Sequence, residues 1–344
     1  MKVNREELLR ALGAASAGLA AREVIEQSSC YCFRGGRIIT FNNELACSVE
    51  SPLKGLEGAV SAKPLLALLS KLAEPEIDVS VANGQLMVKG KDRRSGLKMD
   101  AEVVLPIDAV GMPEESDWKP LAPEFCDGLK LVVECVADDS DTFHYTCVHL
   151  HPQFLEGCDN FQYARYPAPS GLAASALIRG KSATHIVGLG MTAIAETENW
   201  LHFRNASGLI LSCCRFSDQY PDMTQLLNWT GNKTTLPGGL AEMAAKAEIF
   251  SAEKASGNLV HVRLRADMLF VKGEGNSGWY EEKCAVKYGG PPLSFMISPK
   301  LLSAFAGKSQ ECEVSESRLR ITFDKAQYVA CLFVADPVAA PVAA

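Results

Sequence analysis

The feature that most constrains this fold is a pattern of elements that recurs three times along the chain. In each third, the sequence predicts a helix, several strands, a second helix and a closing hairpin. Leu86, Leu201 and Leu319 fall in corresponding hairpins, 115 and 118 positions apart. Because an internal repeat decides the architecture of the whole chain, we expect an α+β fold of three similar domains.

The predicted helices have recognisable start signals. The first begins after Asn4, whose side chain can cap it, with Glu7 three positions further on. Pro123 and Pro237 are 114 positions apart and predict the opening helices of the second and third repeats. The second helices of the three repeats are predicted in segments 61–69, 175–180 and 297–305.

Alternating apolar residues around short turns predict a hairpin after each second helix. The Asn83-Gly84 pair gives the strongest turn signal, because both residues tolerate the positive φ of a type I′ turn. The three hairpins are predicted at residues 78–88, 192–203 and 311–323. Domains are therefore expected at residues 1–112, 113–228 and 229–334, followed by a disordered Ala/Pro/Val tail at 335–344.

Composition favours a globular cytoplasmic protein, with 47% hydrophobic and 22% charged residues. Charged residues such as Glu6 and Arg10 interrupt any apolar region of a signal peptide, and no run approaches the roughly 18 apolar residues of a membrane span. The 12 cysteines lack paired C-x-x-C spacing and are expected to be buried thiols in a reducing compartment. No membrane partner and no cofactor are expected.

Three segments resemble one known family. Segment 1–9 resembles the N-terminal strand and helix of the bacterial DNA polymerase III beta subunit, the sliding clamp. Segment 216–222 resembles the phenylalanine-proline-aspartate-tyrosine segment that ends the second domain of that family, and segment 328–333 resembles its C-terminal strand. The resemblance implies a DNA-clamp fold, in which two three-domain subunits close head to tail into a ring.

The resemblance also implies partners: double-stranded DNA, a DNA polymerase, a clamp loader and a second copy of the chain. It implies no catalysis, because the clamp tethers a polymerase by topology. The family's threonine-aspartate-glycine-histidine-arginine-leucine run matches segment 158–163 only loosely, and the chain continues past the family's usual C-terminus. This divergence indicates a phage or other mobile-element clamp, acting in the cytoplasm of an infected host.

Basic residues on or near the predicted helices are candidates for sequence-independent contact with DNA phosphates. The net charge of −7 does not exclude this role, because a ring needs only a mildly basic lining. Solvated helix faces explain any single residue equally well, but the set recurs in every repeat. The candidates are Arg5, Arg10, Arg22, Lys63, Lys71, Lys130, Arg179, Lys181, Lys246, Lys254, Lys300 and Lys308, and Arg22 also matches a DNA-contacting residue of the family.

A second candidate site is a groove that binds short peptides of partner proteins through apolar anchors. The resemblance assigns seven positions to it, each of which could equally be an ordinary core residue. They are Phe161, Tyr163, Pro221, Leu226, Val329, Cys331 and Phe333.

Two alternatives remain open at this point. One is a metal-dependent enzyme that uses segment 144–151, where Cys147, His149 and His151 would share one face of a strand. The other is a clamp-fold interaction protein that does not encircle DNA. The sequence contains no phosphate-binding loop, no complete dinucleotide fingerprint and no recognisable nucleophile motif.

Overall fold

The structure is a computed structural model that describes residues 1–253 and 258–334. Lys254 and the tail at 335–344 therefore lie outside the described residues, and the predictions made for them stay predictions. The chain forms two compact units, which are described separately below. The first unit contains Met1–Val133, Cys147–Gln153 and Ala168–Asp218, and the second contains Glu134–Thr146, Phe154–Pro167 and the chain from Gln219 onward.

The element order repeats three times: strand, helix, three strands, strand, helix, three strands. The first pass is β1 (Lys2–Asn4), α1 (Arg5–Ala15), β2 (Cys30–Arg34), β3 (Arg37–Phe41), β4 (Leu45–Glu50), β5 (Gly58–Ser61), α2 (Ala62–Lys71), β6 (Glu76–Ala82), β7 (Gln85–Lys89) and β8 (Arg94–Asp100). The second is β9 (Lys119–Pro120), α3 (Phe125–Val133), β10 (Cys147–Leu150), β11 (Leu155–Cys158), β12 (Gln162–Tyr166), β13 (Ala176–Arg179), α4 (Gly180–Gly188), β14 (Ala193–Glu196), β15 (Trp200–Arg204) and β16 (Ile210–Cys214).

The third pass follows a short helix, α5 (Thr224–Leu227). It is β17 (Asn232–Thr235), α6 (Leu240–Ser251), β18 (Val260–Arg265), β19 (Met268–Gly275), β20 (Gly278–Ala285), β21 (Leu293–Ile297), α7 (Pro299–Lys308), β22 (Glu311–Val314), β23 (Arg318–Phe323), β24 (Ala326–Cys331) and a final β25 (Phe333–Val334). The repeat is thus present in the element order, whereas the domain boundaries near residues 112 and 228 stay a prediction.

The strand ladders are antiparallel, as short hairpin connections favour. In the first unit, twelve strands run in the order β1-β6-β7-β8-β5-β2-β3-β4-β16-β15-β14-β9, and β10 pairs with β13. In the second unit, the order is β11-β12-β24-β23-β22-β17 in one part and β20-β19-β18-β21-β25 in another. The prediction of an α+β fold with helices packed on antiparallel sheets is confirmed.

The predicted helix start signals were correct in part. The Asn4 side chain accepts hydrogen bonds from the backbone N–H groups of Glu6 and Glu7, both at 3.0 Å, and so caps α1. Pro299 occupies the first turn of α7, where proline is favourable. Pro123 and Pro237, in contrast, lie in turns before α3 and α6, which begin two and three residues later.

The predicted second helix of the middle repeat was wrong. Residues Ala176–Arg179 form β13, and the helix begins only at Gly180. Three of these four residues are buried and pair with β10. A short apolar run fits a buried strand as well as a buried helix turn, so its periodicity could not separate the two.

All three hairpins are confirmed. β6 and β7 meet at Asn83 and Gly84, whose φ values of 52° and 70° match the predicted turn. β14 pairs with β15, and β22 pairs with β23, around the turns that the sequence indicated.

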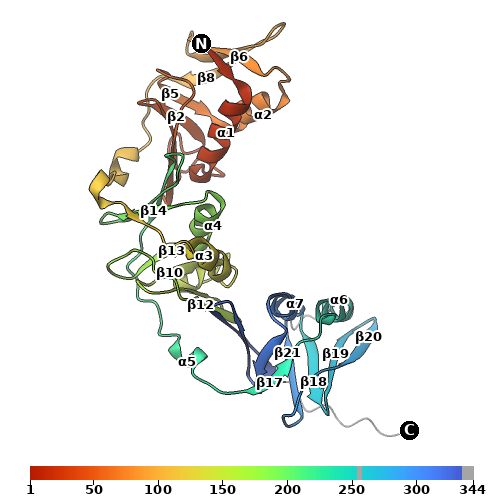
Figure 1. Ribbon diagram of the computed structural model, residues 1–344. Coiled ribbons are helices and arrows are strands. Elements are labelled where there is room, and N and C mark those ends of the chain that lie inside the picture. The colour runs from red at the N-terminus through yellow and green to blue at the C-terminus, as the bar shows by residue number, and fades with distance from the viewer. Residues whose placement is uncertain (254–257, 335–344) are drawn as a thin grey trace. The chain divides into compact units, whose positions relative to one another are not determined.

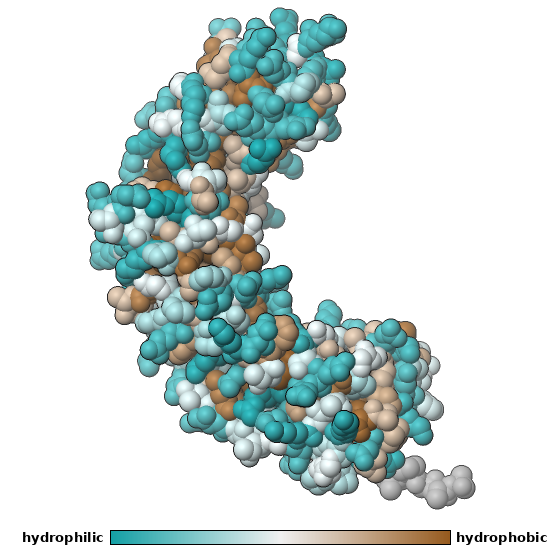
Figure 2. All heavy atoms as spheres, viewed as in Figure 1, coloured by the Kyte–Doolittle hydropathy of each residue, from teal (hydrophilic) through white to brown (hydrophobic). Residues whose placement is uncertain are grey.

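The helices lie in pairs against the sheets. In the first unit α1 contacts α2 and α3 contacts α4, and in the second unit α6 and α7 lie side by side on one face of the strands around β18 and β21 (Figure 1). A Cβ at Gly273 of β19 would come within 1.8 Å of the Ala247 carbonyl oxygen, so this glycine permits the close approach of α6. The viewed surface is mostly hydrophilic, with smaller hydrophobic patches (Figure 2).

Candidate DNA-facing helices and partner groove

The second helix of every repeat carries a lysine at its second position. These residues are Lys63 in α2, Lys181 in α4 and Lys300 in α7, and all three are exposed. Backbone N–H groups at a helix N-terminus are unpaired and carry a partial positive charge. Each of these helix starts therefore combines a mobile ammonium group with a terminus that favours anions.

Four further candidates are exposed basic residues on or beside helices. Arg10 lies on α1, Lys71 ends α2, Lys130 lies on α3, and Arg22 follows the first helix in an irregular segment. Their exposure is compatible with phosphate contact, which depends on accessible charge.

The remaining basic candidates are already engaged by the protein itself. Arg5 donates to the carbonyl oxygens of Glu74 at 3.0 Å and Leu69 at 3.3 Å, and its side chain is only 15% exposed. Arg179 lies 3.7 Å from Glu44, and Lys246 lies 3.0 Å from Glu282. These contacts fit structural roles better than phosphate binding.

Lys308 is engaged in the same way. Its ammonium group lies 2.7 Å from the Glu134 carboxylate and 5.3 Å from the centre of the Tyr328 ring. The C-terminal end of α7 is thereby fixed to Glu134 and to β24, and Lys308 is partly buried.

The structure brings five of the predicted groove residues together, on β12, on β24 and at Phe161 and Phe333 next to these strands. Tyr163 and Val329 are direct cross-strand partners, and the Cys331 N–H donates to the Phe161 carbonyl at 2.8 Å. The Phe161 and Phe333 rings lie 6.0 Å apart between centres. Directly opposed residues of an antiparallel pair share a face, so these side chains form one continuous strip.

Only part of this strip is accessible. Phe161 and Phe333 are 46% and 38% exposed, whereas Tyr163 and Val329 are each 1% exposed. We call the exposed pair, Phe161 and Phe333, the aromatic rim. The rim can contact a partner, while the two buried residues support it from below.

The segment that contains Pro221 and Leu226 contacts β11, β23 and β24. The Tyr220 hydroxyl donates to the Cys158 thiol at 3.1 Å, and Arg318 donates to the Gln225 carbonyl at 3.0 Å. Arg320 donates to the carbonyl of Leu227 at 2.6 Å. Pro221 and Leu226 are half-buried there, and their place in a groove with the strand residues stays a prediction.

Arg318 and Arg320 were missed by the sequence reasoning. Besides these carbonyl bonds, Arg320 donates to the Trp229 carbonyl at 3.2 Å and lies 4.9 Å from the Trp229 ring centre. Guanidinium groups form such multiple, planar contacts well. The signal was present as two arginines at alternate positions of one predicted strand.

A buried charge network lies beneath the segment. The Glu156 carboxylate is 2% exposed and accepts from the Tyr163 hydroxyl at 2.5 Å and from Arg165 at 2.8 Å. Burial, together with the neighbouring Glu156 charge, raises the pKa of Tyr163, which therefore stays protonated. Because the carboxylate is paired and hydrogen-bonded, the network fixes the orientation of Tyr163.

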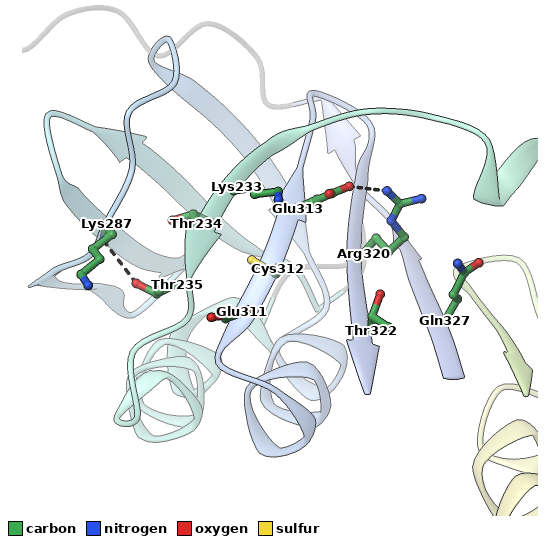
Figure 3. A pocket seen from close by; sticks show the side chains of 10 residues that line it. All are labelled: Lys233, Thr234, Thr235, Lys287, Glu311, Cys312, Glu313, Arg320, Thr322 and Gln327. Atoms are coloured by element: carbon green, nitrogen blue, oxygen red, sulfur yellow. Dashed lines mark hydrogen bonds and ion pairs between the residues drawn. The ribbon is translucent and has the colours of Figure 1, made fainter. Parts of the chain in front are cut away.

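A polar cavity of about 560 Å³ opens over β17, β22 and β23 (Figure 3). Arg320 pairs with Glu313 in it, and the Thr235 hydroxyl accepts from the Lys287 N–H at 3.2 Å. Its lining carries both charge signs and no large apolar side chain. It therefore lacks the apolar anchor sites that the aromatic rim provides.

The next question is whether segment 144–151 could hold the metal ion of the alternative enzyme hypothesis. His149 and His151 lie with ring centres 6.1 Å apart, but nowhere in residues 1–253 and 258–334 do three or more His, Cys, Asp or Glu side chains gather so that they could hold a metal ion. Within the same residues, no helix is long and apolar enough to cross a membrane.

The cysteine thiols agree with the sequence interpretation. Eight of the 12 are buried, and the other four are half-buried. Burial raises the pKa of Cys47 and of Cys158 to about 12 in each case, so both thiols stay protonated and unreactive at neutral pH.

The repeated elements, antiparallel sheets and paired helices define the DNA-clamp fold. Solved structures with this fold include the DNA polymerase III subunit beta from Pseudomonas aeruginosa, with a TM-score of 0.81, 16% identity, and coverage of 97% of this chain and 100% of that chain. The DNA polymerase III beta chain from Streptococcus pneumoniae has a TM-score of 0.83 and 14% identity, and the beta subunit from Thermotoga maritima has a TM-score of 0.81 and 14% identity. Each match covers 97% of this chain and 99% of the other chain. No family model matches the sequence, and no curated protein matches it either.

Proposed function

We propose that this chain is a DNA sliding clamp, a non-catalytic ring subunit that encircles duplex DNA in the cytoplasm and tethers a DNA polymerase to it. The observation that carries the proposal is the lysine at the second position of α2, α4 and α7. A full-length likeness to DNA polymerase III beta subunits supports it. A clamp loader and a second copy of the chain are the further partners of this proposal, and a phage origin stays a prediction.

Three equivalent cationic helix starts suit a ligand that presents phosphates at regular intervals. Lys63, Lys181 and Lys300 are 118 and 119 positions apart, one in each repeat. Phosphate contacts carry no base information, so binding should be independent of sequence and sensitive to salt. These are the properties required of a ring that slides along duplex DNA.

Replacing Lys63, Lys181 and Lys300 together by Gln should weaken duplex binding. Each lost phosphate contact lowers the slope of log affinity against log salt by about 0.9, so we expect a decrease of about 2.7. The measurement is fluorescence anisotropy with a labelled duplex over a salt series. The matched control replaces the exposed Lys2, Lys91 and Lys287 by Gln, and an equal loss in that control would contradict the proposal.

Encirclement is tested separately from affinity. After loading by a bacterial clamp loader with ATP, the protein should stay on closed circular DNA and leave when the circle is cut. Equal retention on both DNA forms would favour the alternative of a clamp-fold interaction protein that does not encircle DNA.

The aromatic rim is the proposed binding place of partner peptides from the polymerase and other replication proteins. Exposed aromatic residues that are supported by a buried layer are typical interaction hot spots. Beta subunits from Pseudomonas aeruginosa and Bartonella birtlesii have been solved with griselimycin bound. We therefore propose griselimycin as a probe of the rim in this chain.

Replacing Phe161 and Phe333 together by Ala should weaken griselimycin binding by at least about 2 kcal/mol, or roughly 30-fold. Isothermal titration calorimetry measures the change. The matched control is Phe323→Ala, because Phe323 is 39% exposed on β23 but takes no part in the rim. A loss of the same size in the control would contradict the assignment.

Two unpaired strand edges support a head-to-tail dimer. Within the first unit β4 pairs with β16, and within the second unit β12 pairs with β24. β4 and β12 are the third strands after the first helix of their repeats, and β20 is the corresponding strand of the third repeat. β16 and β24 close the second and third repeats, and β8 closes the first. β20 is the end strand of its sheet, and residues 94–98 of β8 pair, among the described residues, only with β7. Pairing β20 with β8 of a second copy would complete the series.

The backbone orientation of both edges fits this pairing. Met99 donates to the Gly84 carbonyl at 2.9 Å, so the alternate residues Gly96 and Lys98 direct their N–H groups to the open edge. Val286 donates to the Asp267 carbonyl at 2.9 Å, so Glu281 and Trp279 do the same on β20. The register of the two intrachain pairs, transferred to these edges through the matching hairpins, sets Gly96 opposite Trp279 and Arg94 opposite Glu281.

A further inference from the structure

The sheet of β20, β19, β18, β21 and β25 has α6 and α7 on one face, and no helix of residues 1–253 and 258–334 in the second unit lies on the other. Side chains alternate between faces along a strand, and Val262, Leu264 and Val271 are buried on the face that α6 covers. The intervening residues lie on the other face. We call its aromatic and positively charged members the cationic aromatic face, consisting of Arg263, Arg265, Phe270, Lys272, Trp279 and Lys283.

Cations on this face stack on aromatic rings. The guanidinium carbons of Arg263 and Arg265 lie 5.2 Å and 5.0 Å from the centre of the Phe270 ring. The Lys272 ammonium lies 5.9 Å from the centre of the Trp279 ring, which is 65% exposed. A ring in contact with a cation at one side keeps its remaining surface available for stacking.

The charges on this face are only partly compensated. Arg263 pairs with Glu281, and Lys272 lies 2.7 Å from Glu274. For Arg265 and Lys283, which are both exposed, no carboxylate of residues 1–253 and 258–334 lies within ion-pair distance. Arg265 and Lys283 therefore leave two uncompensated positive charges beside Phe270, on the same face as the exposed Trp279 indole and four or more positions along the strands from it, in a chain whose net charge is −7.

We propose that the cationic aromatic face binds single-stranded DNA. An exposed aromatic side chain offers a stacking surface for an unpaired base, and neighbouring cations meet the phosphates. Duplex DNA keeps its bases stacked inside, so it cannot use Trp279 in this way. An acidic peptide would use the two cations but would leave the flat indole surface without a matching group.

This site is separate from the helices assigned to duplex DNA and needs only the second unit. In the dimer proposed above, Arg94 and Lys98 of a second copy would extend the same face beside β20. This extension rests on the proposed dimer, whereas the inference itself does not.

The test is fluorescence anisotropy of a labelled 20-nucleotide oligo-dT with the full chain. Trp279→Leu should weaken binding about tenfold, because one stacked base is lost. The double variant Arg265→Gln and Lys283→Gln should lower the salt slope by about 1.4, since each single-strand phosphate contributes about 0.7. Lys2→Gln with Lys91→Gln is the matched control for the charge change.

The inference would be overturned if Trp279→Leu bound oligo-dT as tightly as the unchanged chain, or if the lysine control bound it as weakly as the double variant. It would also be overturned if oligo-glutamate displaced the labelled oligo-dT at a lower concentration than unlabelled oligo-dT does. The triple lysine variant of α2, α4 and α7 separates the two proposals. It should lose duplex affinity while its oligo-dT binding stays within twofold of the unchanged chain.

Discussion

Acidification from pH 7 to pH 4 should destabilise this protein by roughly 3 kcal/mol through His202 alone. The His202 ring is fully buried in β15, with one ring nitrogen 3.0 Å from the Thr197 hydroxyl and the other 2.8 Å from the Ser212 hydroxyl. Burial lowers its pKa from 6.5 to about 4, because the charged ring would lose its hydration.

The direction of this effect follows from proton binding. Between pH 6.5 and pH 4 the unfolded chain binds a proton at His202 and the folded chain does not, so stability falls as the pH falls. The contribution is complete above pH 6.5 and is lost below about pH 4. Urea unfolding at several pH values measures this change.

The control for this prediction is His202→Gln. A glutamine side chain can bond to both Thr197 and Ser212 but does not titrate in this range. His144 and His185, whose pKa values burial also lowers, stay present in this variant and supply the remaining acid sensitivity. A pH dependence as steep in His202→Gln as in the unchanged chain would disprove the assignment.

The parts of the fold with local signals could be predicted from the sequence. Asn4 capped a helix and Asn83-Gly84 made a turn, because the side chain and backbone preferences of these residues act within a few positions. The strand at Ala176–Arg179 had no such signal. Its structure depends on pairing with β10, about thirty positions away in sequence.

The burial and the contacts of individual candidate-site residues could not be predicted from the sequence. Tyr163 and Phe161 lie two positions apart and face the same way, yet one is buried and the other exposed. The difference comes from the Glu156 and Arg165 contacts around Tyr163, which no local pattern contains. Lys308 likewise looks like a solvated helix residue until its pairing with Glu134 is known.

The repeat also explains why the proposed dimer was accessible to sequence reasoning only as a family expectation. Two strand pairs join successive repeats within the chain, β4 with β16 and β12 with β24, and a threefold repeat predicts a third such pair. The two existing pairs can be identified only from the strand pairing in the structure. The register then depends on backbone orientation, because a shift by one residue would turn every outward N–H group away from its acceptor.

Replacing Lys98 by Pro should convert the dimer into a monomer at concentrations where the unchanged chain is dimeric. The N–H of Lys98 points to the open edge of β8, so proline removes a bond to the second copy without removing one to β7. We expect dimer affinity to fall by at least about 1.5 kcal/mol, or roughly tenfold. Light scattering should give twice the 37.1 kDa chain mass for the unchanged protein and the single mass for the variant.

Lys98→Gln is the matched control, since it removes the charge and keeps the backbone N–H. Lys98→Gln should remain dimeric. In both variants the first unit, which contains β7 and β8, should melt within a few degrees of its melting temperature in the unchanged chain. If Lys98→Pro dimerises as tightly as Lys98→Gln, the β8–β20 register is wrong. If the unchanged chain is a monomer at every concentration, the ring itself is wrong, because three repeats per chain then leave both strand edges open.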